Sequence, residues 1–209
     1  GYRLYAGRDK NQQWRDRNAL AYRSHKFNLQ TEYALSSLSK LSLSGGLVDA
    51  NRFDGPNGDV FTNAATPALG YAHVTFERPN FFVRGFWNSV SDTTRVLTTP
   101  LLGNLVTLTD RNGSTNVIAR TNTYNIEVQH ALDVGNSHRV IYGLNYRYNT
   151  VSHSQISEYS TENRLGLHLQ DEWRATPSLS LVMGARYDLN TFVNPTISPR
   201  VAVLYKAAQ

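Results

Sequence analysis

Six histidines are the side chains most able to carry acid–base or metal chemistry in this chain of 209 residues. No two of them have the H-x-x-x-H or H-E-x-x-H spacing that brings two imidazoles to one metal ion. The chain also lacks cysteine, so neither a disulfide nor a thiolate metal site can form. We therefore predict no metal site and no cofactor, and we expect solvated or interior-facing imidazoles at His25, His73, His130, His138, His153 and His168.

Catalytic motifs are also missing. No G-x-S-x-G, Walker A or G-x-G-x-x-G sequence occurs anywhere in the chain. His153 lies between Ser152 and Ser154, but the next carboxylate is at Glu158. A histidine that activates water needs an acidic partner placed beside it. We predict that the protein is not an enzyme.

Two polar segments are candidates for ligand contact. The segment DANRFDGPNGD (49–59) offers carboxylate and amide oxygens to Ca²⁺, although their order does not match an EF-hand, so a turn-rich loop is the alternative that we favour. The segment DRNGST (110–115) contains Asn-Gly, a strong two-residue hairpin signal, and predicts a projecting β-arm. Binding residues concentrate on such loops. The loop candidates for substrate contact are Asn51, Arg52, Asp54, Arg111 and Asn112.

The net charge of +5 and the pI near 9.5 raise the question of nucleic acid. Lys and Arg are scattered singly, however, and form no run of five or more. A dispersed basic excess does not build a phosphate-binding stripe. We predict no nucleic-acid partner.

The elements that must position these residues are strands. Within residues 163–188, apolar Leu165, Leu167 and Leu169 alternate with small or polar residues, and after a break at 175–178 the alternation resumes at Leu179. A period of two with a short polar break predicts an antiparallel hairpin. Ten alternating segments occur in all: Tyr2–Arg8, Lys26–Leu35, Lys40–Val48, Gly70–Glu77, Phe81–Asn88, Thr123–Leu132, Arg139–Tyr148, the two strands of this hairpin, and Pro199–Lys206.

The connections between the segments alternate in length. Short polar turns follow every second strand, and the long Asn-, Asp-, Thr- and Gly-rich connections, 49–69 and 89–120, lie between them. A soluble sandwich has no reason to sort its connections in this way, whereas an outer-membrane barrel has short periplasmic turns and long extracellular loops. We predict an all-β fold: an antiparallel, up-and-down transmembrane β-barrel wall of about ten strands. The short turns at 36–40, 77–80, 133–138 and 175–178 should then lie at one end.

The two faces of these strands differ in polarity. We expect Leu165, Leu167, Leu181, Val140, Leu144 and Ile126 to face lipid, and Glu127, Arg147, Glu172 and Arg186 to face a wet interior. The interior arginines Arg84, Arg147 and Arg186 are further candidates for substrate contact. The alternative is that they pair with Glu127, Glu172 and Asp188 across strands.

One stretch resembles a known family. LQDEWRATPSLSLVMGARYD followed by SPRVAVLYK is similar to late barrel strands of TonB-dependent outer-membrane receptors. The residues that carry the resemblance are Gln170, Asp171, Glu172, Trp173, Gly184, Arg186, Tyr187, Asp188, Ser198, Pro199 and Arg200.

The resemblance implies a receptor that imports a scarce, bulky nutrient through the outer membrane of a Gram-negative bacterium. A ferric siderophore is the default ligand, and cobalamin, haem or an oligosaccharide stay open. It implies as partners the outer-membrane lipid, a plug domain, the remaining barrel strands and the TonB complex. Such barrels have about 22 strands, so we expect residues 1–209 to be one barrel segment without a plug domain, open and inactive in transport when alone. The alternatives are a passive ten-stranded pore or an adhesin-like barrel.

Overall fold

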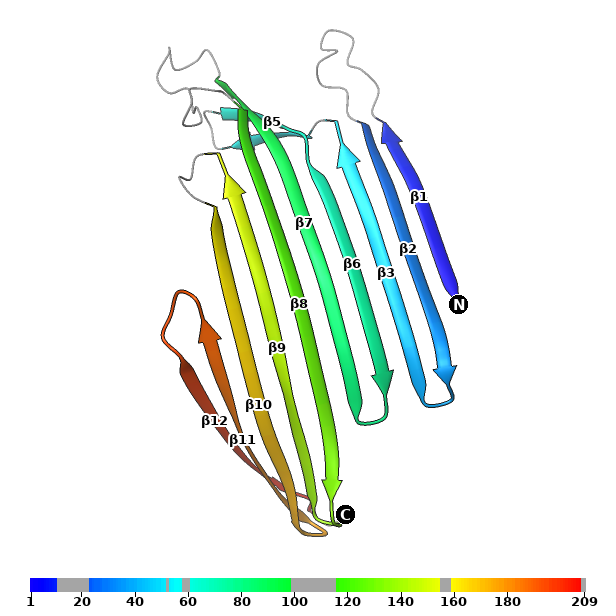
Figure 1. Cartoon of the computed structure of the whole chain (residues 1–209), viewed down its shortest axis with the longest axis vertical. Coiled ribbons are helices and arrows are strands. Elements are labelled where there is room, and N and C mark those ends of the chain that lie inside the picture. The colour runs from blue at the N-terminus through cyan, green and yellow to red at the C-terminus, as the bar shows by residue number, and fades with distance from the viewer. Residues whose placement is uncertain (11–22, 52, 58–60, 99–115, 155–158, 208–209) are drawn as a thin grey trace.

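The computed structural model describes residues 1–10, 23–51, 53–57, 61–98, 116–154 and 159–207. Ten antiparallel strands follow one another across a single sheet, in chain order (Figure 1). The described residues contain no helix with the length and apolarity to cross a membrane. The strands of the sheet are β1 (Tyr2–Lys10), β2 (Arg23–Ser36), β3 (Ser39–Ala50), β6 (Ala68–Arg78), β7 (Phe81–Thr98), β8 (Asn116–Val134), β9 (His138–His153), β10 (Ser160–Thr176), β11 (Leu179–Asn190) and β12 (Thr196–Tyr205).

The four short turns lie at one end of the sheet, as the alternation of connection lengths predicts. They join β2 to β3, β6 to β7, β8 to β9, and β10 to β11. Asn80 and Gly135, with φ of 63° and 62°, supply the left-handed backbone that two of these turns need. We name this end the turn end and the opposite one the loop end. The prediction of an all-β, up-and-down barrel wall is confirmed.

The loop end contains strand structure that the sequence does not predict. Residues 49–69 hold a hairpin of β4 (Phe53–Asn57) and β5 (Phe61–Ala65), and β5 pairs with β7 beyond the point where β6 ends. Strand β4 pairs with β5 alone, and proline is tolerated on an edge strand of this kind, where Pro56 lies. The ladder between β7 and β8 continues to Arg95 and Asn116, which confirms a projecting arm, while its expected Asn-Gly turn lies outside the described residues.

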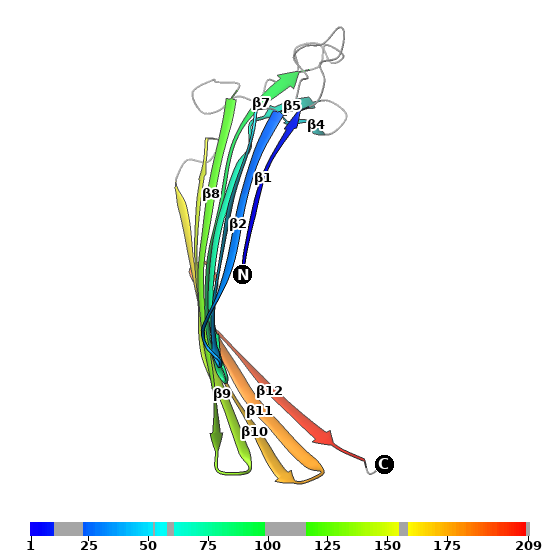
Figure 2. The same ribbon diagram turned by 90° about the vertical axis from the view of Figure 1, so that its right-hand side faces the viewer.

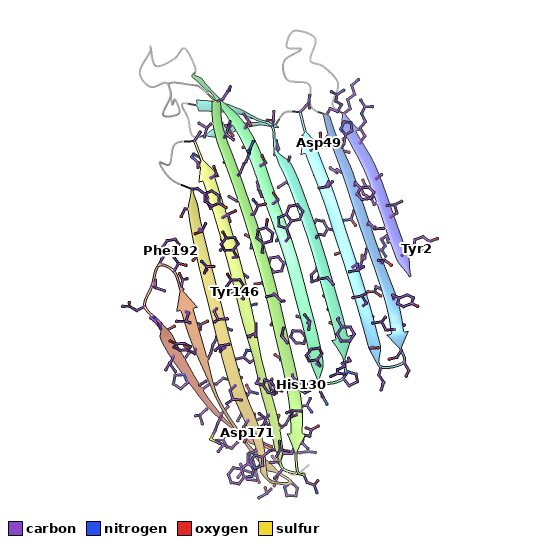
Figure 3. The ribbon with its side chains drawn as sticks, in the orientation of Figure 1. Tyr2, Asp49, His130, Tyr146, Asp171 and Phe192 are labelled. Carbon is purple, nitrogen blue, oxygen red and sulfur yellow. The ribbon has the colours of Figure 1, made fainter. Side chains whose placement is uncertain are left out.

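One face of the sheet, the outer face, is apolar. The register aligns these side chains across neighbouring strands, and Figure 3 labels Tyr146 and His130 among them. They have no cover: Leu47 is 60% exposed and Leu169 is 57% exposed. A face of this kind is what a transmembrane wall turns toward lipid. One row across it runs through Tyr33, Leu41, Phe76, Val83, Val128, Leu144, Leu167, Tyr187 and Ile197.

The opposite, inner face is polar. Its matching row contains charged, hydroxyl and amide side chains, including Glu32, Thr75, Arg84 and Glu127. All ten residues whose facing the sequence predicts lie on the expected side: the six aliphatic residues on the outer face, and Glu127, Arg147, Glu172 and Arg186 on the inner face. Period-two alternation determines the face because every strand keeps its register through the ladder.

Glycines on the inner face make room for large neighbours across the ladder. The ring of His168 lies over Gly143, where an added Cβ would be 2.6 Å from the imidazole and 2.4 Å from the carbonyl oxygen of Val128. Tyr71 covers Gly46 in the same way. Aromatic cover of this kind protects the glycine backbone and fixes the register of the pair.

The sheet is bowed and open (Figure 2). Among the described strands, β1 pairs only with β2 and β12 only with β11. The two outermost strands lie apart at opposite edges in Figure 1. The expectation of an open, curved sheet is confirmed, and the closed ten-stranded pore considered as an alternative is not the structure found. Unpaired edge groups need partners when the sheet lies in lipid.

We expect Leu167→Arg to lower the free energy of unfolding of the barrel by about 2–4 kcal/mol, because it places a cation against the hydrocarbon. The matched control is His168→Arg, one residue along β10 on the inner face, where the effect should be small. Denaturant titration in lipid vesicles measures both. Similar losses at the two positions would contradict the assigned faces.

Candidate ligand-binding surface at the loop end of the inner face

A polar hollow lies on the inner face where β8, β9 and β10 approach the loop end. Its volume is about 400 Å³. Alternation turns Thr123, Arg147 and Glu162 toward the inner face here, and the register brings the three strands level. The hollow has the size of a small-ligand site. It is lined by Thr121, Asn122, Thr123, Arg147, Asn149, Thr150, Val151, Ser160, Thr161, Glu162, Arg164 and Phe192.

Glu162 organises one side of this hollow. Its carboxylate accepts hydrogen bonds from Arg164 Nε at 2.7 Å, Asn149 Nδ2 at 2.8 Å and Asn190 Nδ2 at 3.2 Å. These donors come from β10, β9 and β11, and the Glu162 side chain is only 15% exposed. A carboxylate with this many donors is firmly oriented, because charge-assisted hydrogen bonds are the strong ones. Glu162 thereby neutralises Arg164.

Arg147 is the cation that stays available. Its Nε donates to Asn125 Oδ1 at 3.4 Å, and its guanidinium carbon lies 5.9 Å from the centre of the Phe86 ring. Within the described part of the chain, no carboxylate forms an ion pair with it. The register also sets Arg147 directly opposite Arg164, so the hollow is lined by two guanidinium groups and one carboxylate. The hollow therefore has a net positive charge and suits an anionic group.

The other two interior arginines predicted to contact substrate, Arg84 and Arg186, each have a carboxylate partner. Arg186 forms a close pair with Asp188, with Nε–Oδ1 and Nη2–Oδ1 distances of 2.8 Å. Arg84 has its Nη2 3.9 Å from Glu77 Oε1 and its guanidinium 4.2 Å from the Phe82 ring centre. Two of the three arginines therefore pair with an acid, as expected, but not with the expected arrangement. Asp188 lies on the same strand as Arg186, and Glu77 is the partner of Arg84. Neither Glu127 nor Glu172 forms a described ion pair.

The loop candidates do not gather at this hollow. Asn51 closes the loop end of β2 and β3, accepting at its Oδ1 from the backbone N of Arg23 at 2.6 Å. Asp54 lies in β4, opposite Ala64. The remaining three, Arg52, Arg111 and Asn112, lie outside the described residues. Of the oxygen donors considered for Ca²⁺, Asp49 contacts His25 at 3.5 Å, and no cluster of three metal-binding side chains occurs among the residues described.

The residues of the QDEW and G-x-R-Y-D motifs divide between the two faces. Gln170, Glu172, Gly184, Arg186, Asp188, Ser198 and Arg200 lie on the inner face, and Asp171, Trp173, Tyr187 and Pro199 on the outer face. Asp171, labelled in Figure 3, accepts a hydrogen bond at Oδ2 from Nδ1 of His138 at 2.8 Å. The His138 ring stacks on Trp173, with ring centres 6.1 Å apart. This group lies beside the turn end, where aromatic girdles of barrels meet the interface.

The sequence reading did not single out Glu162, Arg164, Asn149 or Asn190. Their polarity fits the alternation of β9, β10 and β11, which was the available signal. Their convergence depends on which residues oppose one another, and alternation alone does not supply the register.

Comparison with known proteins identifies the architecture. A model of the β-barrel of TonB-dependent receptor-like proteins matches residues 1–209. The structure is similar to the siderophore receptor PirA of Pseudomonas aeruginosa, with a TM-score of 0.63 and 12% identity over 100% of this chain and 34% of that one. It is also similar to a variant of the ferric enterobactin receptor PfeA of Pseudomonas aeruginosa, with a TM-score of 0.52 and 12% identity over 88% and 31% of the two chains.

A third similar structure is the siderophore receptor PiuA of Acinetobacter baumannii, with a TM-score of 0.50 and 10% identity over 97% and 41% of the two chains. Identities this low establish a shared fold. This chain spans about a third of the length of PirA. No sequence among the curated proteins matches it.

We expect Glu162→Ala to loosen the loop end of β9 and β10 by about 1–3 kcal/mol, because three donors lose a largely buried acceptor. Amide hydrogen exchange at residues 147–151 and 160–164 should accelerate. Glu172→Ala is the matched control on the same strand and face, since no side-chain hydrogen bond or ion pair is described for Glu172. Unchanged exchange in Glu162→Ala would show that the network does not hold the strands.

Proposed function

The chain belongs to the β-barrel family of TonB-dependent receptor-like proteins, and from this we propose that it forms part of the wall of an outer-membrane receptor. The receptor imports a scarce, bulky nutrient across the outer membrane of a Gram-negative bacterium. The observation that carries this proposal is the match of the family model to residues 1–209. The family consists of receptors rather than enzymes, in agreement with the lack of catalytic motifs.

A ferric siderophore is the ligand that we propose. The similar structures of PirA, PfeA and PiuA are siderophore or ferric enterobactin receptors by name. The inner-face hollow adds a physical reason, because Arg147, which forms no ion pair with a carboxylate among the described residues, suits a chelate with anionic oxygen groups. Phe192, at 65% exposed, provides an apolar surface beside it for the organic part of such a ligand.

The role proposed for this segment is a simple one. The loop end faces the cell exterior and the turn end the periplasm, as connection length indicates for barrels. A ligand entering from outside meets the inner-face hollow near the mouth of the lumen. The wall makes and breaks no covalent bond. Its register holds the contacting groups in place, while the remaining strands join at β1 and β12, and the plug domain and the TonB complex supply movement.

Uptake of iron-55 by cells that express the complete receptor tests this function. We expect iron accumulation from a ferric catecholate or hydroxamate chelate, and the half-saturating concentration should rise about tenfold in Arg147→Glu, since one charge-assisted contact is lost. The matched control is Arg174→Glu, an inner-face charge reversal at the turn end, which should transport like the wild type.

Two results would contradict the proposal. Receptor-dependent uptake of cobalamin or haem but of no ferric chelate would replace the siderophore with another nutrient. Equal effects of Arg147→Glu and Arg174→Glu would remove the hollow as the binding surface while leaving the transport function in place.

A further inference from the structure

A row of mostly polar residues crosses the inner face at the level of the inner-face hollow. At one end of the row lie Asn149 and Glu162 of the hollow, and at the other end lie tyrosines of β1 and β6. The register aligns the row strand by strand from β1 to β10, through Tyr5, Asn28, Gly46, Tyr71, Asn88, Thr123, Asn149 and Glu162. The proposed function uses only the end at the hollow.

Tyr71 lies flat on the sheet. Its side chain starts on β6, crosses β3 over Gly46, and accepts a hydrogen bond at its hydroxyl from Asn28 Nδ2 on β2. An added Cβ at Gly46 would lie 2.6 Å from Cε1 of the ring, so a larger residue there would displace it. One face of the ring therefore rests on the backbone, and the other face is turned toward the lumen.

Tyr5 repeats this arrangement on β1. Its ring lies over Gly7 of the same strand, where an added Cβ would be 3.0 Å from Cζ, and the side chain is 56% exposed. The register sets Tyr5 directly opposite Asn28, on the side away from Tyr71. Two tyrosine rings thus flank one amide. We name Tyr5, Asn28 and Tyr71 the tyrosine subsite.

The chemistry of the tyrosine subsite differs from that of the hollow. Its three members carry no charge, and Lys26 in the neighbouring row toward the loop end forms an ion pair with Asp9. The neighbouring row toward the turn end holds Arg3, Gln30 and Ser44. Guanidinium, amide and hydroxyl groups all form hydrogen bonds with neutral hydroxyls. The subsite therefore combines flat ring faces with hydrogen-bonding groups at their edges.

A sugar ring fits this combination. The face of a tyrosine ring is the negative side of its quadrupole and attracts C–H groups, which a pyranose presents on its own face. The hydroxyls at the edge of the pyranose need partners, and Asn28 Oδ1 stays able to accept because its bond to Tyr71 uses only Nδ2. A plain aryl ring would stack but leave these polar groups without partners, and a site built for hydroxyls discriminates against such an analogue.

The tyrosine subsite and the hollow lie within reach of one ligand. From Tyr71 to Asn149 the row crosses β7 and β8, a path of about 14 Å along the sheet. Asn88 and Thr123, which lie between them, are polar and continue the row. A bulky ligand can therefore place an anionic part in the hollow and an uncharged arm on the tyrosines.

We propose that the tyrosine subsite binds an uncharged sugar ring, and that the transported ferric chelate carries such a ring as an arm. The chelate part of this inference rests on the proposed function, with Arg147 as the contact for anionic oxygens. The sugar part depends on neither iron nor ligand charge.

Binding of a ferric tris-catecholate with and without glucosyl arms to the complete purified receptor, followed by intrinsic fluorescence, tests the proposal. We expect the glucosylated chelate to bind the wild type with an about tenfold lower Kd than the parent chelate. Tyr71→Leu and Tyr5→Leu should remove most of this advantage and leave the Kd of the parent chelate unchanged. Tyr71→Phe keeps the ring and should keep the advantage. Phe82→Leu is the matched control, because Phe82 is an inner-face ring near the turn end, beneath Arg84, and should bind both chelates like the wild type.

Folding of each variant is checked by heat-dependent electrophoretic mobility. The proposal is overturned if glucosyl arms add no affinity in the wild type, or if folded Tyr71→Leu and Tyr5→Leu keep the full advantage. Equal weakening of both chelates in Tyr71→Leu would also overturn it, because the ring would then contact the chelate and not the sugar.

Maltotriose, an uncharged saccharide without iron, separates this inference from the siderophore proposal. If neither ferric chelate binds, the siderophore proposal fails, and maltotriose alone decides the tyrosine subsite. Binding of maltotriose that is lost in Tyr71→Leu and kept in Arg147→Glu supports the subsite. No binding to the wild type, or equal binding to the wild type and Tyr71→Leu, overturns it.

Discussion

Backbone hydrogen bonding across neighbouring strands is the constraint on which the rest of this structure depends. A hydrocarbon layer offers no water to unpaired N–H and C=O groups, so the backbone groups of each strand must form hydrogen bonds with the neighbouring strands along its whole length. From β1 to β12 the ladder is antiparallel throughout. Its register shifts in these strands occur only next to turns, between Ala34 and Ser36 and between Arg174 and Thr176. The pairing is therefore regular across the part of the wall that faces lipid.

Because the register is regular, the same strand pairing decides which residues lie on the outer face and which lie on the inner face. Tyr146 lies on the outer face while its neighbour Arg147 enters the inner-face hollow, and Tyr124 likewise lies on the outer face while Asn125 accepts from Arg147 on the inner face. A slip of one residue would place arginine in lipid and tyrosine in the lumen. The glycines strengthen this choice, because His168 over Gly143 and Tyr71 over Gly46 fit only when those residues oppose one another. Packing on the inner face therefore stabilises the register that places the residues of both faces.

The available positive charge on the wall depends on which arginines have a carboxylate partner, and not on the number of charged residues. Glu162 and Asp188 each neutralise a neighbouring arginine on their own strand, whereas no described carboxylate forms an ion pair with Arg147. Arg147 lies on the inner face near the loop end. Strands β8, β9 and β10 supply the inner-face hollow, and the same strands carry an apolar row toward lipid on the opposite face.

The sequence by itself determined the elements and their facing. Alternation identified ten strands, connection length sorted the two ends, and the aromatic-ended motifs at Gln170–Trp173 and Gly184–Asp188 indicated the family. These features are local, since the side-chain period of a strand depends only on its own residues. The tertiary structure decided the partners. It brought Asn149, Arg164 and Asn190 to Glu162 and gave Arg147 no carboxylate partner among the described residues. It also paired β5 with the extension of β7. Each of these depends on which residues of separate strands oppose one another, and that register is set by the whole ladder.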